Sequence, residues 1–106
     1  MGLINISELE VVERLPGWRG RYFHSAEMTF AHYEFARGGS IHEHSHAQEE
    51  VYQVIEGELR ITIADVVSTL RPGTIAIVPA KARHSVEALS DGRVLIVECP
   101  RRPEFE

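Results

Sequence analysis

Residues 38–57 read GGSIHEHSHAQEEVYQVIEG, and this stretch decides which side chains the fold must bring together. Three of the six histidines in the chain stand here at every second position, and a pair of glutamates follows. In a β-strand, residues two apart point to the same face and lie about 6.6 Å from each other. His42, His44 and His46 are therefore expected to form a ladder of imidazoles on one surface.

Two neighbouring rings of this ladder can bind one metal ion, but all three cannot. Metal–nitrogen bonds are about 2.0–2.1 Å long, so two adjacent rings can lean onto one ion. The outer pair is about 13 Å apart along the backbone, so one histidine is left over. The bend at 47–49 returns the chain, which lets Glu50 face the same site and supply a negatively charged ligand. The alternative is a solvated edge strand whose histidines face water.

A chain of 106 residues with 43% hydrophobic residues is expected to form one globular domain over residues 1–106. The net charge of −5 argues against binding to nucleic acid or to an anionic membrane. The single cysteine, Cys99, cannot form an internal disulfide. The N-terminus does not resemble a secretory signal, and no apolar run approaches the roughly 20 residues that a membrane helix needs. These features predict a cytoplasmic protein.

From Trp18 onward, short β-prone runs alternate with glycine or proline turns, which predicts an all-β fold. The predicted strands cover residues 28–36, 40–46, 50–64, 66–70, 74–79, 84–89 and 93–99. The run at 50–64 is either two pairing strands or one strand bent at Gly57. Ser90-Asp91-Gly92 is predicted to be a hairpin turn, and the tail from 100 to be irregular.

The N-terminal arm, about residues 1–17, is less clearly defined. Periodicity leaves residues 4–15 open between a short amphipathic helix and an edge strand, and Pro16-Gly17 closes the arm with a turn. The arm and Trp18 are expected to cover a barrel edge or a partner subunit. Since small barrels leave edges that need covering, a homodimer is expected.

Residues 38–57 resemble the first motif of the cupin family, G-x5-H-x-H-x3-E-x6-G. The residues in register are Gly38, His44, His46, Glu50 and Gly57. This register selects His44 and His46 and leaves His42 as the spare histidine.

Residues 73–88 resemble the second cupin motif, G-x5-P-x-G-x2-H-x3-N, through Gly73, Pro79 and His84. Lys81 stands where the family prefers glycine, which suggests a different turn backbone before His84. Ala88 stands where the family prefers asparagine, at a position that is not a ligand. Two motifs in the expected order are more specific than either motif alone.

The resemblance implies a single-domain, RmlC-like cupin jelly-roll β-barrel whose interior is lined by alternate residues of each strand. It also implies one metal site, with His44, His46, Glu50 and His84 as the ligands. Three imidazoles and a carboxylate suit a divalent transition metal such as Fe, Mn, Ni, Zn or Cu. One or two open coordination positions would let the metal polarise a substrate oxygen or activate water.

The C-terminal half is similar to small cupins of the pectin-degradation type, which are associated with linearising unsaturated uronates. Aligned on Pro100, Ile96 replaces the aspartate of that branch, Glu98 replaces its aromatic residue, and Arg102 is kept. The branch has a glutamine where Glu50 stands. The fork of Arg102 could hold a substrate carboxylate, and Glu98 could replace the missing acid/base if it points inward. The favoured interpretation of Glu98 and Arg102 is, however, a solvated pair near the C-terminus.

Three other residues are considered as candidates for the site, and for two of them a purely structural role is expected. Tyr52 lies two residues beyond Glu50 on the same strand face, so it is either a cavity residue or a core aromatic. Cys99 is expected to be a small buried residue. His24 is expected to lie in a turn and face solvent.

Together these features predict a metal-dependent isomerase, lyase or cyclase. Its substrate is expected to be a small oxygen-rich compound that can carry a carboxylate, such as a sugar acid. The alternatives are an iron- or copper-dependent dioxygenase and a non-catalytic protein that binds a metal or a small molecule.

Overall fold

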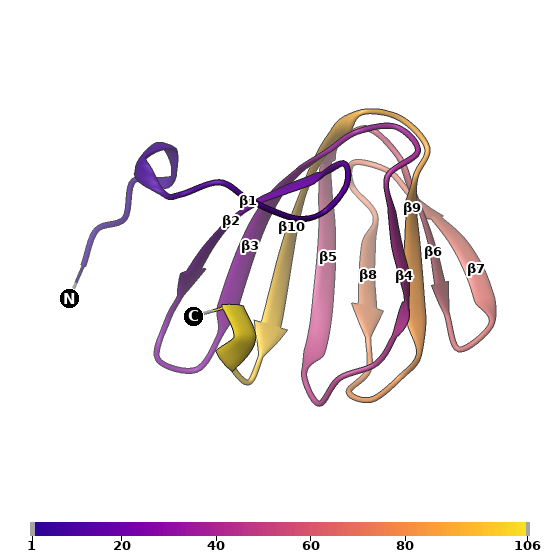
Figure 1. The fold of residues 1–106 in the computed structure, drawn as a ribbon. Coiled ribbons are helices and arrows are strands. Elements are labelled where there is room, and N and C mark those ends of the chain that lie inside the picture. The colour runs from indigo at the N-terminus through magenta and orange to yellow at the C-terminus, as the bar shows by residue number, and fades with distance from the viewer. Residues whose placement is uncertain (1, 106) are drawn as a thin grey trace.

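The computed structural model describes residues 2–105, which form two antiparallel β-sheets around a common core (Figure 1). This confirms the all-β prediction, because the described range contains ten strands and two short 3₁₀ turns but no α-helix. The elements are η1 (Ile6–Glu8), β1 (Val12–Leu15), β2 (Trp18–His24), β3 (Thr29–Phe35), β4 (Ser40–His44), β5 (Glu49–Glu56), β6 (Leu59–Ile63), β7 (Val66–Leu70), β8 (Ile75–Val78), β9 (His84–Ala88), β10 (Gly92–Cys99) and η2 (Pro103–Phe105). In this range no helix is long and apolar enough to cross a membrane.

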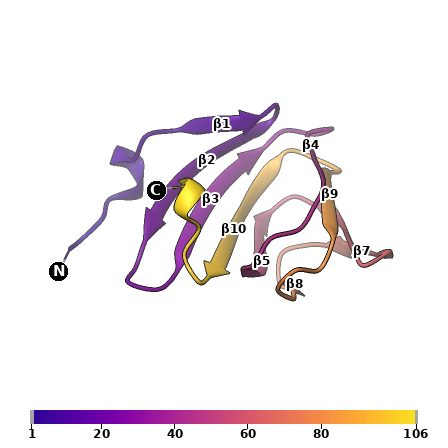
Figure 2. The same ribbon diagram turned by 60° about the horizontal axis from the view of Figure 1, so that its bottom comes forward.

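The strand pairing is that of one long hairpin rolled up. β3 pairs with β10, β4 with β9, β5 with β8, and β6 with β7, always antiparallel. The two sheets have the orders β1-β2-β3-β10-β5-β8 and β4-β9-β6-β7, so the chain repeatedly passes from one sheet to the other (Figure 2). This is the jelly-roll arrangement that the motif resemblance implied.

The topology corrects two of the predicted hairpins. Residues 50–64 do contain two strands, but β5 and β6 lie in different sheets and do not pair. Ser90-Asp91-Gly92 likewise joins β9 to β10, which also lie in different sheets. The two crossings pack together at Gly57, whose φ is +84° and where a Cβ would lie 2.3 Å from the carbonyl oxygen of Asp91. Glycine fits this position because it accepts a positive φ and has no Cβ.

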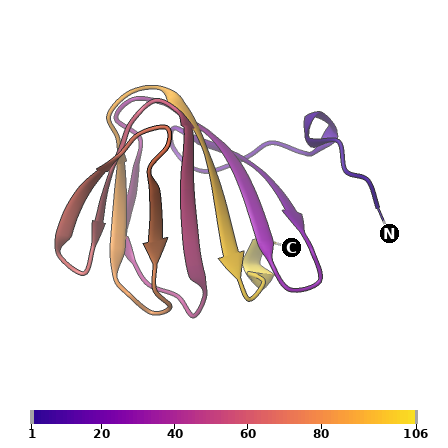
Figure 3. The same ribbon diagram turned by 180° about the vertical axis from the view of Figure 1, so that it is seen from behind.

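The N-terminal arm combines both of the alternatives that periodicity left open. A single 3₁₀ turn, η1, is followed by the edge strand β1, which pairs with β2 across the Pro16-Gly17 turn. The segment before β1 extends away from the barrel (Figures 1 and 3). Trp18 does not cover an outer edge: it is buried in the core, and its ring centroid lies 5.6 Å from that of Tyr33.

The core lies between the sheets and follows the alternation of each strand. On β5 and β10 the inward-facing residues Tyr52, Val54, Val94 and Ile96 are almost completely buried. Burial of each such side chain contributes about 1.5–3 kcal/mol to stability. The same alternation directs two carboxylates, Glu50 and Glu98, into the barrel interior, where both are only 3% exposed. Buried carboxylates need a charged or hydrogen-bonding partner, so they mark a site.

Candidate metal centre

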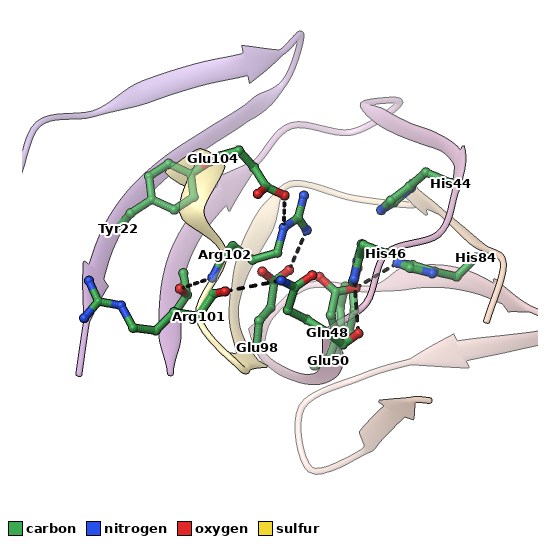
Figure 4. Close-up of polar contacts among 12 residues, drawn as sticks. Tyr22, His44, His46, Gln48, Glu50, His84, Glu98, Arg101, Arg102 and Glu104 are labelled. Carbon is green, nitrogen blue, oxygen red and sulfur yellow. Dashed lines mark hydrogen bonds and ion pairs between the residues drawn. The ribbon is translucent and has the colours of Figure 1, made fainter. Parts of the chain in front are cut away.

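Four side chains from three strands and one loop converge at one wall of the barrel interior. His44 ends β4, His46 follows in the next loop, Glu50 lies on β5, and His84 begins β9. One ligand atom from each of these residues lies within 4.8 Å of the others. Figure 4 shows the three imidazoles and the carboxylate turned toward one another. The structure therefore brings together the four residues that the motif resemblance selected, in a group that could hold a metal ion.

A bulge in β4 explains how the histidine ladder is broken. Ile41 pairs with Val86, but His44 pairs with His84, so β4 has one residue more than β9 over this interval. A bulge of this kind bends a strand and re-aims its side chains. The ring centroids of His44 and His84 come to 4.2 Å from each other, whereas the exposed His42 ring lies 6.1 Å from that of His44 and outside the group.

The turn before His84 differs from the expectation for Lys81. Lys81 has a φ of +69°, so lysine here adopts the left-handed backbone that glycine favours, and the expected change of turn backbone is not found. Its backbone N–H donates to the carbonyl oxygen of His46 at 2.8 Å. This bond ties the loop that carries His46 to the turn that positions His84.

Each of the three imidazoles is oriented by a backbone carbonyl. Nδ1 of His44, His46 and His84 lies 2.8, 3.1 and 2.9 Å from the carbonyl oxygens of His42, Gln48 and Ala82, respectively. Since a carbonyl only accepts hydrogen bonds, each Nδ1 carries the proton and each Nε2 presents a lone pair. Metal-binding histidines are typically held in this way.

The distances between the Nε2 atoms of the histidines and the Glu50 carboxylate indicate whether the site fits a cation. Nε2 of His84 lies 2.8 Å, and Nε2 of His46 lies 3.4 Å, from Oε1 of Glu50. Neither nitrogen has a correctly directed hydrogen-bond partner in residues 2–105, although both are buried. Two lone pairs thus face a carboxylate oxygen, which is unfavourable unless a proton or a metal ion lies between them. The donor set fits a divalent transition metal.

The pKa shifts of Glu50 and His84 also indicate that the four-residue group favours a positive charge. Burial alone would raise the pKa of Glu50, but the imidazoles of His46 and His84 outweigh it and hold that pKa well below its usual range. Burial alone would lower the pKa of His84, but the Glu50 carboxylate outweighs it and raises that pKa. Burial lowers the pKa of His44. A positive charge placed at His84 is therefore stabilised by Glu50.

Tyr52 and Glu98, both predicted as cavity candidates, lie directly beside the ligands. The hydroxyl of the buried Tyr52 donates to Oε1 of Glu50 at 3.3 Å. Glu98 is paired with Glu50 across β10 and β5. Its Oε1 accepts from Nη1 of Arg102 at 3.1 Å, while its buried Oε2 has no partner among the described residues. Burial raises the pKa of Glu98, and so do a hydrogen bond from its protonated carboxyl to Glu50 and the charge of Glu50, so the proton on Glu98 is shared with the metal-ligand carboxylate. The favoured interpretation of Glu98 and Arg102 as a solvated pair is therefore wrong, because both side chains are largely buried.

Arg102 is held from two sides by carboxylates. Besides Glu98, its guanidinium donates through Nε to Oε1 of Glu104 at 2.5 Å, and its backbone N–H donates to Oγ1 of Thr29 at 2.8 Å. Figure 4 shows Arg102 lying between Glu104 and Glu98. Two of its five N–H donors, one on Nε and one on Nη1, thus bond to carboxylates of the chain, and the charge of the guanidinium is compensated.

The C-terminal segment is irregular, as predicted, apart from the single 3₁₀ turn η2, and it packs against one side of the site. Gln48 donates to the carbonyl oxygen of Arg101 at 3.2 Å. The Phe105 ring packs on Tyr22 with centroids 4.8 Å apart. His24 lies 2.9 Å from Oγ1 of Thr29 through Nδ1 and 3.2 Å from the carbonyl oxygen of Phe105 through Nε2, so it does not face solvent as expected.

A cavity of about 420 Å³ opens beside the metal ligands, large enough for a small molecule. Its wall is mainly aromatic and aliphatic, with Trp18, Tyr22, Tyr33, Tyr52, Ile96 and Phe105 among the lining residues. Arg14, Glu98, Arg102 and Glu104 also line it. The hydroxyls of Tyr22 and Tyr33 lie 2.8 Å apart and hydrogen-bond to each other.

Sequence reasoning missed several residues of this cavity. The alternation of β2 places Trp18 and Tyr22 on one face, and that signal could have identified Tyr22. Nothing in the local pattern indicated that Arg14 and Phe105, near opposite ends of the chain, would meet. Cys99 was expected to be buried, but it ends β10 on the opposite face and is exposed.

Comparison with known proteins agrees with this architecture. Residues 31–99 match the sequence profile of a family described as "Cupin domain". An uncharacterized protein from Streptomyces coelicolor is 31% identical over 81 residues, which cover 76% of this chain and 77% of that protein.

Solved structures share the fold at low sequence identity. An RmlC-like cupin from Shewanella frigidimarina has a TM-score of 0.92 at 20% identity and covers 100% of this chain and 96% of its own. KdgF from a Halomonas species has a TM-score of 0.92 at 21% identity, with 100% and 99% coverage. Oxalate decarboxylase from Bacillus subtilis has a TM-score of 0.81 at 20% identity and covers 94% of this chain but only 31% of its own. These structures show that the chain shares the cupin fold over its whole length.

Proposed function

The chain belongs to the cupin domain family, and from this premise we propose that it is a metal-dependent isomerase, lyase or cyclase. Its substrate would be a small, oxygen-rich compound that carries a carboxylate, such as a sugar acid. The observation that carries the proposal is the placement of Glu98, whose buried Oε2 receives no hydrogen bond from the described residues, next to Glu50 on the wall of a cavity that three of the four candidate metal ligands also line.

A divalent metal held by His44, His46, Glu50 and His84 would supply Lewis acidity toward a substrate oxygen. Glu98 is placed to exchange a proton with the substrate through Oε2. In an enol–keto conversion, the proton would leave Glu98 for the substrate carbon as the C=C bond becomes single and the C–O bond becomes double. The proton of the enol hydroxyl would then restore Glu98, so that atoms and electrons balance.

Two further residues act through these groups. Tyr52 donates to Oε1 of Glu50 and so fixes the carboxylate. Arg102 holds Oε1 of Glu98, which leaves Oε2 as the reactive oxygen. Both residues are positioning residues in this account.

The sugar-acid class is supported by the resemblance to pectin-degradation-type cupins and by the likeness of fold to KdgF. Ile96 stands where that branch has an aspartate, and it lies opposite Tyr52 in the sheet. Glu98 is two residues further along the same face, so it is placed to take over the acid/base role. We also propose a cytoplasmic location, which the lone Cys99 supports because it cannot form an internal disulfide.

The test is proton exchange at carbon in the metal-loaded protein, purified without an affinity tag. An unsaturated uronate and a series of 2-oxo sugar acids would be incubated in D₂O, and deuterium incorporation next to the carbonyl followed by NMR. We expect exchange or conversion with the wild type and its loss in Glu98→Gln. Glu56→Gln, which changes an exposed glutamate on the neighbouring strand, is the matched control.

The two alternative functions predict different results in the same experiment. Consumption of dissolved oxygen with an enolic compound would assign the protein as a dioxygenase. Binding of the compound without exchange, conversion or oxygen uptake would assign it as a binding protein. Full exchange in Glu98→Gln would contradict the proposed role of Glu98.

A further inference from the structure

The charged groups that line the cavity differ in whether they already have a partner. Arg102 is paired with Glu98 and Glu104, and Glu50 faces His46 and His84. Arg14, on β1, also lines the cavity, but it has no hydrogen bond and no ion pair with any residue in the range 2–105. Arg14 is exposed to solvent, and of the two arginines that line the cavity it is the one without a carboxylate partner in the described range.

Arg14 is nevertheless held in place. Its guanidinium carbon lies 4.8 Å from the ring centroid of Phe105 and 5.2 Å from that of Tyr22. These two rings pack on each other at 4.8 Å, so the guanidinium rests on an aromatic platform. Contact with ring faces orients a guanidinium but uses none of its five N–H donors. A fork of donors is thus presented at the cavity without an acceptor from the chain.

The position of this platform relative to the metal ligands matters for a bound molecule. In Figure 4 Tyr22 lies on one side of the site and His84 on the other, with Arg102 and Glu98 between them. A molecule that reaches from the metal ligands to the platform would pass the reactive oxygen of Glu98. Its end at the platform would meet Arg14.

We propose that Arg14 binds the anionic group of the substrate, and that the substrate is a small anion bearing a carboxylate at the end away from the metal-binding group. This deepens the proposed function and rests on it. It also changes the assignment made from the family resemblance, which gave this role to Arg102. The charge of Arg102 is already compensated by Glu98 and Glu104, so it attracts a substrate carboxylate less strongly than Arg14, which has no carboxylate partner in the range 2–105.

The test uses matched pairs of 2-oxo acids with the cobalt(II)-loaded protein, whose visible spectrum reports ligand binding. The 2-oxo acid group binds the metal in every compound, and the far end is either a carboxylate or a methyl group. The pairs are 2-oxoglutarate with 2-oxopentanoate, 2-oxoadipate with 2-oxohexanoate, and 2-oxopimelate with 2-oxoheptanoate. The series in length allows for the span between the metal ligands and Arg14.

At one or more lengths we expect the dicarboxylate to bind about tenfold more tightly than its methyl partner, the value of one charge-assisted hydrogen-bonded contact. Arg14→Gln should remove this difference, and Arg14→Lys should restore part of it, since a point charge remains. Arg19→Gln is the matched control, because it removes an exposed arginine of the same hairpin that lies outside this cavity. It should keep the full difference.

The proposal is overturned if no pair shows a preference, or if the preference survives in Arg14→Gln and is lost in Arg102→Gln. A role of Arg14 only in packing Phe105 would weaken both members of a pair equally and would also overturn it. Binding of the methyl-terminated acids tests the proposed function separately. If the metal is bound but neither member of any pair binds, the open coordination site and this inference both fail.

Discussion

At the scale of single residues, the proton on Nδ1 of each site histidine is fixed by a backbone carbonyl. Each Nε2 lone pair that faces Glu50 is stabilised only when a proton or a metal ion lies between the nitrogen and the carboxylate. In the metal-free protein a proton can take that place at His84, because Glu50 raises the pKa of His84. A metal ion competes for the same place. Protonation of His84 and metal binding therefore exclude each other.

The first prediction concerns the stability of the metal-free protein. A raised pKa in the folded state gives stability that is complete below the usual His pKa of about 6.5 and is lost as the pH rises through the folded pKa. In chelator, His84→Gln should therefore lower the melting temperature more at about pH 5.5 than at about pH 8.5. Thermal unfolding of both proteins at both pH values measures this. An equal loss at the two pH values would contradict it.

The second prediction has the opposite sign and concerns metal affinity. The imidazoles must be neutral to bind a metal, so the affinity should rise as the pH increases through the raised pKa of His84. Glu50, whose pKa is lowered, stays ionised over this range and adds no pH dependence. Calorimetric titration with a divalent metal across neutral pH measures the effect. A pH-independent affinity would show that His84 is not a ligand.

The third prediction concerns Lys81, whose left-handed backbone costs an L-residue about 1–2 kcal/mol. Glycine removes this cost but loses about 0.5–1 kcal/mol through greater freedom in the unfolded chain. Lys81→Gly should therefore be as stable as the wild type or up to about 1.5 kcal/mol more stable. Lys81→Val, which is β-branched, should be clearly less stable. Denaturant unfolding measures the free energy of unfolding of each variant. A Lys81→Val variant as stable as the wild type would contradict the left-handed backbone at this position.

At the scale of elements, η2 has a larger role than its length suggests. It carries Phe105, which packs on Tyr22 and supports Arg14, and it follows Arg102 directly. Two backbone carbonyls of the segment, those of Arg101 and Phe105, contact Gln48 and His24. The C-terminal segment is therefore one wall of the cavity rather than a loose end.

The fourth prediction tests this wall. Phe105→Ala should destabilise the fold by only about 1–2 kcal/mol, because the ring is partly exposed. It should also make the C-terminal segment more susceptible to limited proteolysis, since the ring contacts with Tyr22 and Arg14 are lost. Phe105→Leu keeps an apolar contact, so its stability and its resistance to proteolysis should lie between those of the wild type and those of Phe105→Ala. Unchanged proteolysis in Phe105→Ala would show that the segment is held by its backbone contacts alone.

Elements also show which parts of the fold could be predicted from the sequence. Strand alternation and turn residues placed most strands within a few residues, because those signals are local. Pairing could not be predicted in the same way: β5 and β6 are separated by a glycine turn and yet lie in different sheets. The same holds for the meeting of Arg14 with Phe105, which depends on the closed barrel. The metal ligands could be predicted because their spacing in two motifs is itself the signal.

At the scale of the whole molecule, the two sheets have different outer faces. On the six-stranded sheet the register aligns Ile77, Val51, Val97, Phe30 and Phe23 in a row across five strands. Ile77 is 59% exposed, and Ile75 and Ile55 lie nearby at 49% and 42%. The four-stranded sheet presents polar groups such as Arg60 and Glu87, which pair with each other. Among the described residues, its large exposed apolar side chains are confined to Val66 and Val67 on the edge strand β7. An apolar row of this length on a small protein is typical of an interface.

We propose that this row packs against the same row of a second copy, as a homodimer with twofold symmetry requires. The fifth prediction is that Ile77→Glu shifts the protein toward monomer, because it places a charge in the centre of that contact. Val67→Glu is the matched control, with a similarly exposed side chain (61%) on the other sheet. Sedimentation or light scattering measures the oligomeric state. A wild-type monomer, or a dimer unaffected by Ile77→Glu, would contradict the proposed interface.

The convergence of four side chains on one metal ion is the central claim, and metal content measured by elemental analysis of tag-free protein tests it most directly. We predict one divalent transition metal per chain in the wild type and in His42→Ala. In His44→Ala, His46→Ala, Glu50→Ala and His84→Ala the affinity should fall by more than about 100-fold, because each leaves the site one ligand short. Loss of the metal from His42→Ala with full retention in His44→Ala would contradict the account, as would a wild type that binds no metal.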